Sequence, residues 1–243
     1  MQIEYLIFLT IFTPALVGCL NLVFHKNANM RDGVTLLGAL ITFYFSINIF
    51  LGFDGQATQY KLVTIMPGID VSFHIEPLGV IFSLLASSLW ILTHIYAIGY
   101  MRGANEKNHS RFFLFFSVSI ASVMGISFSG NLFTLFLFYE ILTLITFPLV
   151  SHKGSSEALR GARVYLSILL GTSIGLQLLG IIWIYFSVGT LDFVKGGILN
   201  GSFGPVELII LVALFAFGIG KAALFPFHRW LPAAMVAPTP VSA

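Results

Sequence analysis

The sequence predicts an all-α membrane protein with about seven transmembrane helices. Its residues are 57% hydrophobic and only 9% charged, with a mean hydropathy of +0.95, whereas a soluble domain carries roughly 25% charged residues. Stretches of about 18 to 26 residues with almost no charge recur along the chain, each long enough to cross roughly 30 Å of hydrocarbon. The predicted spans run approximately over residues 3–24, 33–53, 77–98, 112–129, 132–151, 164–188 and 206–225.

The first span is expected to remain as a membrane anchor. Glu4 stands where a secretory signal has basic residues, and the apolar run continues without a small-residue cleavage site. The single cysteine, Cys19, lies inside this span, so neither an intrachain disulfide nor a thiol metal site is expected.

The basic residues predict the orientation of the spans. They alternate between connections, and cytoplasmic connections are the ones enriched in Lys and Arg. The N-terminus is therefore expected outside and the last segment at the cytoplasmic side. The basic connections hold Lys26 and Arg31, then Arg102, Lys107 and Arg111, then Lys153, Arg160 and Arg163, and finally Arg229, while the others hold only Lys61 and Lys195.

The connection over residues 54–76 predicts a small β-hairpin on the outer surface. Two runs of alternating residues, YKLVTIM and IDVSFHIE, flank Pro67-Gly68, and a turn dipeptide between alternating runs is typical of a hairpin.

The seventh span is expected to break near Pro226. Pro232, Pro238 and Pro240 follow it closely, and proline removes a backbone donor and clashes with the preceding helical turn. Broken backbone at membrane depth is tolerated where protein or a water-filled cavity satisfies it. A break just after an intramembrane lysine therefore indicates a hydrated path.

Glu140 and Lys221 are the candidate site, because among the charged residues only these two fall well inside the predicted spans. A charge in hydrocarbon costs roughly 2.5–3.5 kcal/mol on insertion scales, so it persists where it pairs, faces a cavity or carries protons. One turn from Glu140 the chain offers a single hydroxyl, Thr143. Burial disfavours both charged forms and mutual proximity favours them, so the separation of the two groups sets their protonation. The pair is predicted to act as a switchable proton site.

Two structural alternatives stay open for this pair. It could be a static ion pair that fixes helix register, or Lys221 could extend to the cytoplasmic surface. Arg229 and Trp230 make a better marker of the membrane interface, which places Lys221 about two turns deeper.

The six histidines show no metal-binding spacing, so no metal site is predicted. His94, within the third span, fits a hydrogen-bonded structural histidine better than a proton relay. His228 is an accessory candidate that could accept a proton at the cytoplasmic mouth, with a hydrogen-bonded loop residue as the equal alternative. Gly-rich nucleotide loops and paired catalytic carboxylates are absent from the sequence, so no cofactor is expected on this chain and it does not resemble a soluble enzyme.

Three segments carry a family resemblance. HIEPLGVIFSLLASSLWILTHIYAIGYM, LFYEILTLITFPLV and GIGKAALFPFHRWLPAAMVAPTPVSA resemble the antiporter-like membrane subunits shared by respiratory complex I (NADH:quinone oxidoreductase) and the Mrp-type cation/proton antiporters. The resemblance implies that an acidic residue on the fifth helix and a lysine on a discontinuous seventh helix form half of a proton channel. Those positions correspond to Glu140 and Lys221.

The resemblance also divides the chain. Residues 1–110 are expected to form an N-terminal three-helix region with the hairpin, and residues 111–243 the first, incomplete five-helix transporter repeat. Family members normally have about fourteen helices, so the chain resembles only their N-terminal half. Its expected partners are other membrane subunits of a hetero-oligomeric complex, H⁺ and Na⁺, and the lipid bilayer, with no nucleic acid. Its expected location is the bacterial cytoplasmic membrane or an equivalent energy-transducing membrane.

Three functions follow as alternatives. FYEILTLITFPLV resembles antiporter sequences more than quinone-reductase sequences, which favours a proton-translocating subunit of an Mrp-type monovalent cation/proton antiporter. The second alternative is a proton-pumping subunit of complex I, driven by NADH oxidation in other subunits. The third is a truncated membrane scaffold that transports nothing.

Overall fold

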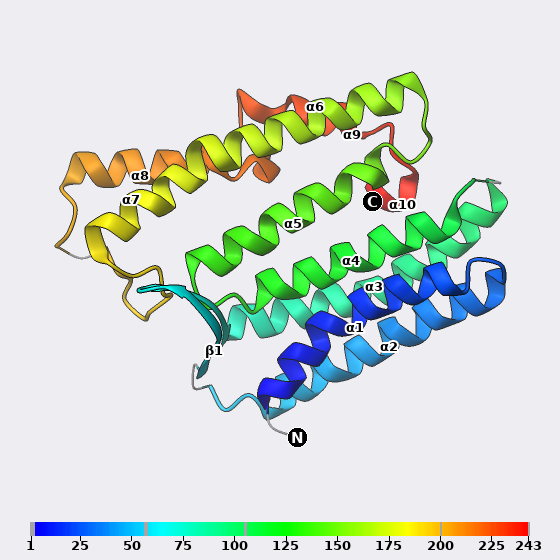
Figure 1. Cartoon of the computed structure of the whole chain (residues 1–243), viewed down its shortest axis with the longest axis horizontal. Helices are drawn as coiled ribbons and strands as arrows, with labels where there is room; N and C mark the ends of the chain where they lie inside the picture. Colours follow the sequence, from blue (N-terminus) through cyan, green and yellow to red (C-terminus); the bar gives the residue numbers. More distant parts are fainter. Residues whose placement is uncertain (1–2, 56–57, 105, 200, 243) are drawn as a thin grey trace.

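Long helices make up most of the chain (Figure 1). The computed structural model describes residues 3–55, 58–104, 106–199 and 201–242. The helices are α1 (Ile3–Val23), α2 (Ala28–Gly52), α3 (Pro77–Gly103), α4 (His109–Ser127), α5 (Leu132–Val150), α6 (Ser156–Thr172), α7 (Leu178–Val188), α8 (Pro205–Gly218), α9 (Trp230–Ala234) and α10 (Thr239–Ser242). Two strands, β1 (Thr58–Met66) and β2 (Ile69–Ile75), form the only sheet of the described residues. The predicted class, an all-α membrane protein with a small hairpin, is confirmed.

Six helices of the described chain are long and apolar enough to cross a membrane. They are α1 to α5 and the continuous helix Ser156–Val188, in which a π-helical turn, Ser173–Gln177, joins α6 to α7. The seventh apolar helix, α8, has 14 residues. It is shorter than the predicted span 206–225 because it ends at Gly218, ahead of Pro226.

Polar caps extend several helices beyond the predicted spans. The Asn27 side chain accepts a hydrogen bond from the Met30 amide at 3.2 Å and so starts α2 at Ala28. Ser155 caps α6 in the same way, through the Ala158 amide at 3.1 Å. As a result Arg160 and Arg163 lie on α6, although the sequence pattern assigned them to a connection.

The same extension adds two charged residues to a membrane-length helix, which the predicted span 33–53 left out. Arg31 and Asp32 lie in the first turns of α2 and are each only 4% exposed. They pair with each other at 2.8 Å. A search for uncharged stretches of sequence leaves such a pair out. The pair can nevertheless be buried, because its two charges neutralise each other.

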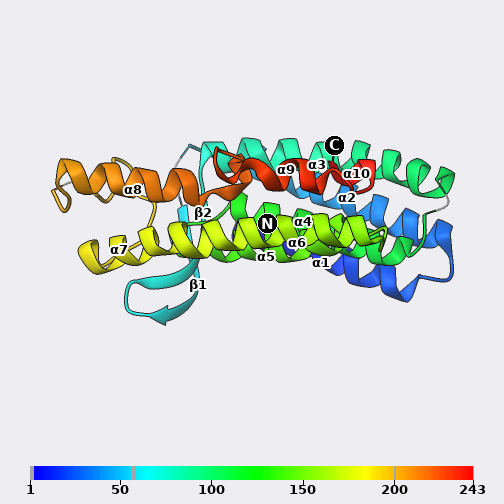
Figure 2. The same cartoon turned by 90° about the horizontal axis from the view of Figure 1, so that it is seen from above.

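The helices form two layers (Figure 2). In one layer α1, α4, α5 and the α6–α7 helix lie side by side, and the second layer holds α2, α3 and the C-terminal segments. Helix α1 packs on α2 and α4, α3 packs on α2 and α4, and α6 packs on α5 and α9. The first four helices thus make one bundle, and α5 connects it to α6.

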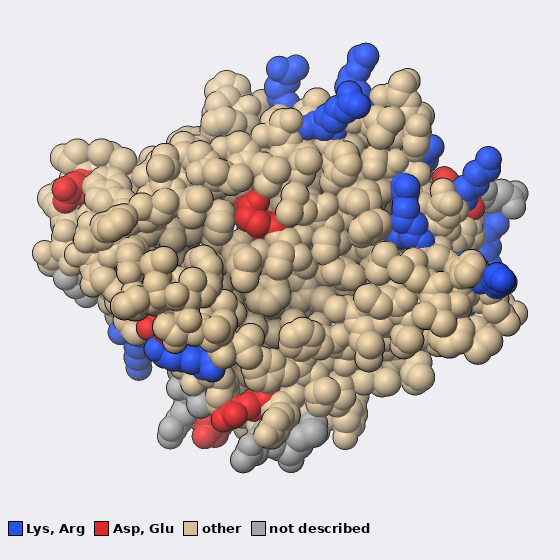
Figure 3. Space-filling model, in the orientation of Figure 1, with Lys and Arg blue, Asp and Glu red and all other residues tan. Residues whose placement is uncertain are grey.

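Charge is distributed unevenly along the helix axes. Lys and Arg gather toward the end where α1 meets α2, α3 meets α4 and α5 meets α6, while the middle of the displayed face is nearly uncharged (Figure 3). We call this end the basic end, and the opposite end, which carries β1 and β2, the hairpin end.

The hairpin is antiparallel, pairs Met66 with Ile69, and turns at Pro67 and Gly68. Gly68 has a φ of +79° and its missing Cβ leaves room for the Gly189 carbonyl, so glycine is required there. Asn131 fixes the hairpin to α5: its amide donates to the Asp70 carbonyl at 2.7 Å while its own oxygen caps the Thr134 amide at 2.7 Å.

Candidate proton-transfer site at the α8 interruption

Two glycines bring the end of α8 against α6 and the π-helical turn that follows it. A Cβ on Gly218 would lie 2.6 Å from the Gln177 amide nitrogen, and a Cβ on Gly220 would lie 2.3 Å from the Thr172 hydroxyl. Ala223 then adopts a φ of +51°, which no α-helix continues through. The interruption therefore begins after Gly218 and extends past Pro226, the predicted position of the break.

The interruption meets a second irregularity on the neighbouring helix. The π-helical turn Ser173–Gln177 lies directly against the end of α8, and π-turns are frequent at functional positions. The freed Gly220 carbonyl accepts a hydrogen bond from the Trp230 indole at 2.8 Å. The broken backbone is thus partly satisfied from within the protein, as membrane depth requires.

Lys221 lies in a single 3₁₀ turn, Gly220–Ala222, within the interruption and not inside a continuous helix. Its ammonium donates to the Thr143 hydroxyl and to the Tyr139 carbonyl, the latter at 3.4 Å. The same nitrogen lies 3.6 Å from the centre of the Tyr139 ring, a cation–π arrangement. The Lys221 amide also donates to the Tyr139 hydroxyl at 3.2 Å. Two residues of α5 therefore hold the lysine.

Glu140 is the neighbour of Tyr139 on α5 and is half-buried. Its Oε1 atom is buried and has no hydrogen-bond partner among the described residues. No ion pair within 4.0 Å joins Glu140 to Lys221 in the described part of the chain, although the two groups interact electrostatically. The structure thus places the two predicted residues in one region without direct contact.

A cavity adjoins Lys221 between α5, α6 and the C-terminal helices. Its volume is about 290 Å³, which is room for several water molecules. Polar groups from Thr146, Tyr165 and Trp230 line it together with apolar side chains. The lysine therefore faces a space that can hold water on one side and α5 on the other.

The two accessory candidates lie outside this arrangement. Pro226 precedes the 3₁₀ turn Phe227–Arg229 and is exposed. His228 is exposed as well, and its ring stacks on Phe225 with centroids 5.6 Å apart. Within the described chain the hydrogen bonds of Lys221 go to α5, and neither accessory candidate takes part in them.

Tyr139 is the residue that the sequence did not single out. It is one of many aromatic residues in an apolar helix, so its type carries no signal by itself. Thr143 was visible as the only hydroxyl one turn from Glu140, which is the signal that could have identified a lysine partner.

These features define a polytopic helical membrane protein with a partly buried ionisable residue at a helix interruption. Residues 129–243 match the family model described as NADH:quinone oxidoreductase/Mrp antiporter, TM. Residues 66–113 match the one described as NADH-ubiquinone oxidoreductase (complex I), chain 5 N-terminus. The chain belongs to the antiporter-like membrane subunit family shared by complex I and the Mrp antiporters.

Relatives come from both branches of this family. The antiporter subunit mnhA2 of Staphylococcus haemolyticus is 34% identical over 82% of this chain and 25% of its own length. The chloroplastic NAD(P)H-quinone oxidoreductase subunit 5 of Ipomoea purpurea is 30% identical over 97% of this chain and 35% of its own length. The chain therefore spans about a quarter to a third of these relatives.

The fold also matches a solved structure. The Mrp complex from Dietzia sp. DQ12-45-1b contains a chain that superposes on all of this one with a TM-score of 0.82. Its sequence identity is 19%, and this chain covers 26% of it. At that identity the match shows a shared fold.

Proposed function

We propose that this chain is the N-terminal part of a proton-translocating, antiporter-like membrane subunit, and that Lys221 is its central proton carrier. The observation that carries the proposal is the position of Lys221, a largely buried amine at a helix interruption beside a cavity that can hold water. Buried ionisable residues at membrane depth are expensive and are typical of proton pathways.

The contacts of the lysine suggest how its proton could be held and released. The Thr143 hydroxyl, the Tyr139 carbonyl and the Tyr139 ring face all stabilise an ammonium in preference to a neutral amine. Moving the lysine away from α5 removes all three contacts at once. Burial then favours the neutral amine over the ammonium. A shift of the interruption relative to α5 would therefore release the proton toward the cavity.

Glu140 has a supporting role in this proposal. Its carboxylate is close enough to interact electrostatically with Lys221, and its buried oxygen has no other partner among the described residues. A lysine rotamer that reaches Glu140 would replace the α5 contacts by an ion pair. The two carriers could thus exchange a proton within the same region.

Within the family, we favour the Mrp-type monovalent cation/proton antiporter. The relatives of the chain include mnhA2 and a K(+)/H(+) antiporter protein of Rhizobium meliloti, which is 35% identical over 72% of this chain. Other membrane subunits, H⁺, a monovalent cation such as Na⁺ and the lipid bilayer are the proposed partners. An energy-transducing membrane such as the bacterial cytoplasmic membrane is the proposed location.

A proton-pumping subunit of complex I is the second candidate. The chloroplastic relative aligns with 97% of the chain, and the family model of residues 66–113 carries the complex I description. Purification of the whole complex distinguishes the two candidate functions. Redox subunits should accompany a complex I subunit, whereas small hydrophobic antiporter subunits should accompany an Mrp-type subunit.

The test is proton transport by the whole complex in inverted membrane vesicles, followed with a ΔpH-sensitive dye. We expect Glu140→Gln and Lys221→Ala each to abolish ΔpH-linked transport while leaving membrane insertion intact. Glu157→Gln and Lys195→Ala, at exposed positions, are matched controls that should transport normally. Wild-type rates in both site variants would instead favour the third alternative, a membrane scaffold.

A further inference from the structure

A second set of polar residues lies inside the bundle of α1 to α4, away from Lys221. Each of the four helices turns polar side chains toward the others, and on α2 this stripe runs from Arg31 to Ser46, about 22 Å at 1.5 Å per residue. The side chains are at most 4% exposed. The interior polar stripe comprises Thr10, Asn21, Arg31, Asp32, Thr35, Thr42, Ser46, Ser83, Ser87, Trp90, His94, Ser117 and Ser122.

Five atoms of this stripe are buried without a hydrogen-bond partner among the described residues. They are Asn21 Nδ2, Ser46 Oγ, Trp90 Nε1, His94 Nδ1 and Ser117 Oγ. Buried polar groups nearly always have a partner. Helix packing keeps lipid out of the bundle, so internal water is the partner that such an interior can hold.

His94 is the titratable group of the stripe, and its protonation follows from its contacts. Its Nε2 atom lies 3.1 Å from the Asp32 carbonyl, which can only accept, so Nε2 carries a proton. In the neutral imidazole Nδ1 is then a bare acceptor, and this atom is one of the five without a partner. The ring is 0% exposed and contacts Phe113 edge-on at 5.0 Å.

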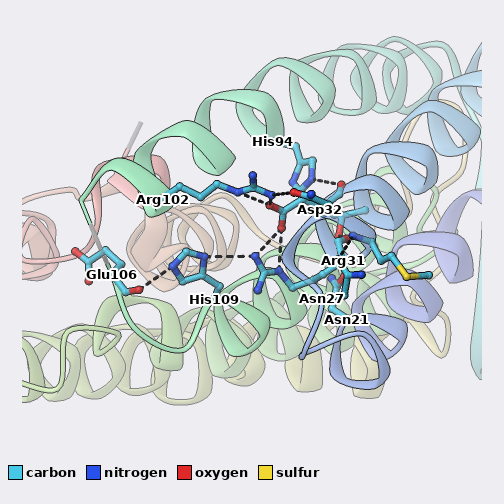
Figure 4. A network of polar contacts seen from close by, with 11 residues as sticks. Asn21, Asn27, Arg31, Asp32, His94, Arg102, Glu106 and His109 are labelled. Atoms are coloured by element: carbon cyan, nitrogen blue, oxygen red, sulfur yellow. Dashed lines mark hydrogen bonds and ion pairs between the residues drawn. The ribbon is translucent and has the colours of Figure 1, made fainter.

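A charged network covers the stripe at the basic end (Figure 4). The Asp32 carboxylate accepts from Arg31 at 2.8 Å and from Arg102 Nε at 3.0 Å. Arg31 also points toward His109 Nδ1 at 3.4 Å. The Arg102 side chain is 43% exposed, whereas the Asp32 side chain that it pairs with is 5% exposed. The network therefore links the exposed basic end to the residue that bonds to His94.

At the hairpin end the bundle is closed by apolar side chains. Ile49 follows Ser46 on the same face of α2, and Val80 precedes Ser83 on the same face of α3. Both are at most 1% exposed. They join a cluster with Leu6, Ile7, Ile11, Phe73, Ile75, Met124 and Phe128. The stripe therefore has one polar end and one apolar end.

We propose that the interior of α1 to α4 is a second proton-binding site, a chain of internal waters that connects to the basic end, stops at the apolar cluster, and has His94 Nδ1 as its proton acceptor. Its ligands are water and H⁺. The charged groups beside His94 are Asp32 and Arg31 of α2. Asp32 pairs in turn with Arg102 of α3, and Arg31 points toward His109 of α4. The site exchanges protons with one side of the membrane only, so it loads protons beside the Lys221 pathway without forming a through channel.

The first test measures water in the bundle. The whole protein, labelled with ¹⁵N-tryptophan in lipid nanodiscs, is transferred to D₂O, and the indole signal of Trp90 is assigned by its loss in Trp90→Phe. We expect the Trp90 indole, although 1% exposed, to exchange about as fast as that of Trp230, which is partly exposed and lines the cavity beside Lys221. A Trp90 indole at least tenfold more protected than that of Trp230 would overturn the proposal, since a dry bundle excludes deuterium.

The second test follows the proton. In ¹⁵N-histidine spectra we expect the Nδ1 signal of His94, assigned by its loss in His94→Gln, to move to the protonated position as the pH falls from about 8 to about 5. Ser117→Ala should change that titration, whereas Ser88→Ala, at a lipid-side position bonded to the Leu85 carbonyl, should leave it unchanged. A signal that stays unprotonated throughout would refute proton binding at His94, whatever the state of Lys221.

Discussion

Lys221 bonds to Thr143, a neutral hydroxyl one helical turn beyond Glu140, and forms no ion pair with the carboxylate itself within the described chain. The Thr143 hydroxyl donates its own proton to the Tyr139 carbonyl at 2.9 Å, so its oxygen accepts from the ammonium. A neutral acceptor stabilises the charged lysine less than a carboxylate in direct contact would. Thr143 is thus suited to hold an ammonium that later gives up its proton.

Thr143 should therefore matter nearly as much as the charged residues. Thr143→Val keeps the shape and removes the acceptor, and a hydrogen bond to a charged group contributes about 1.5–3 kcal/mol. We expect proton transport by the whole complex to fall about tenfold or more. Thr143→Ser, which keeps the hydroxyl, should retain most of the rate. Equal rates in the Val and Ser variants would show that the bond has no part in transport.

The end of α8 should tolerate no added carbon. In Gly220→Ala the new Cβ would lie 2.3 Å from the Thr172 hydroxyl, and overpacking of this kind costs about 1–3 kcal/mol. We expect a lower thermal midpoint together with loss of transport. Gly171→Ala is the matched control, because a Cβ there meets nothing within 4 Å, and its midpoint should equal or exceed that of the wild type.

The hairpin should have a defined pH range of stability. Lys61 pairs with the Asp70 carboxylate, and hydrogen bonding to Lys61 and Thr64 lowers the pKa of Asp70. The bond to Asp70 raises the pKa of Lys61. The stabilisation of the hairpin by Asp70 is therefore complete above about pH 4 and is lost as the pH falls through the lowered pKa of Asp70. The stabilisation by Lys61 is present below about pH 10 and is lost as the pH rises through the raised pKa of Lys61.

Amide hydrogen exchange across β2 measures the pH dependence of hairpin opening directly. Exchange corrected for its intrinsic pH dependence should be constant between those limits and increase below the lower one. Asp70→Asn should abolish the acid step. A hairpin in that variant that still opens with acid would contradict the role given to Asp70.

Asn131 should be the most sensitive helix cap. It is 1% exposed, caps α5 and holds the Asp70 carbonyl. Asn131→Ala removes a cap of about 1 kcal/mol together with the buried bonds to the Asp70 carbonyl and the Ser72 hydroxyl, at a further cost of roughly 1–3 kcal/mol. Asn27→Ala removes only an exposed cap of α2 and should cost about 1 kcal/mol. Equal unfolding midpoints for the two variants would contradict the anchoring role of Asn131.

The order of the helices and the position of the hairpin could be predicted from local patterns alone. Apolar stretches of membrane length and the alternation around Pro67-Gly68 are properties of short windows of sequence. Helix ends were less predictable: charge counting started the second span at Gly33, after Arg31 and Asp32, whereas α2 begins at Ala28 and the structure buries the two residues as a pair. Arg102, 70 residues away in the chain, also bonds to the Asp32 carboxylate, and no short window of sequence contains that contact.

For the site, the sequence by itself determined that the chain spans a membrane and that Glu140 and Lys221 are the charged residues deepest in its apolar segments. Residue type and position within an apolar stretch can be read from the sequence, and both enter the cost of an ion in hydrocarbon. The tertiary structure alone decided what Lys221 touches. Gly218 and Gly220 let α8 end against Gln177 and Thr172, which turns the lysine toward Tyr139 and Thr143. Those contacts join residues about 80 positions apart, and only the close packing of α5, α6 and α8 brings them within hydrogen-bonding distance.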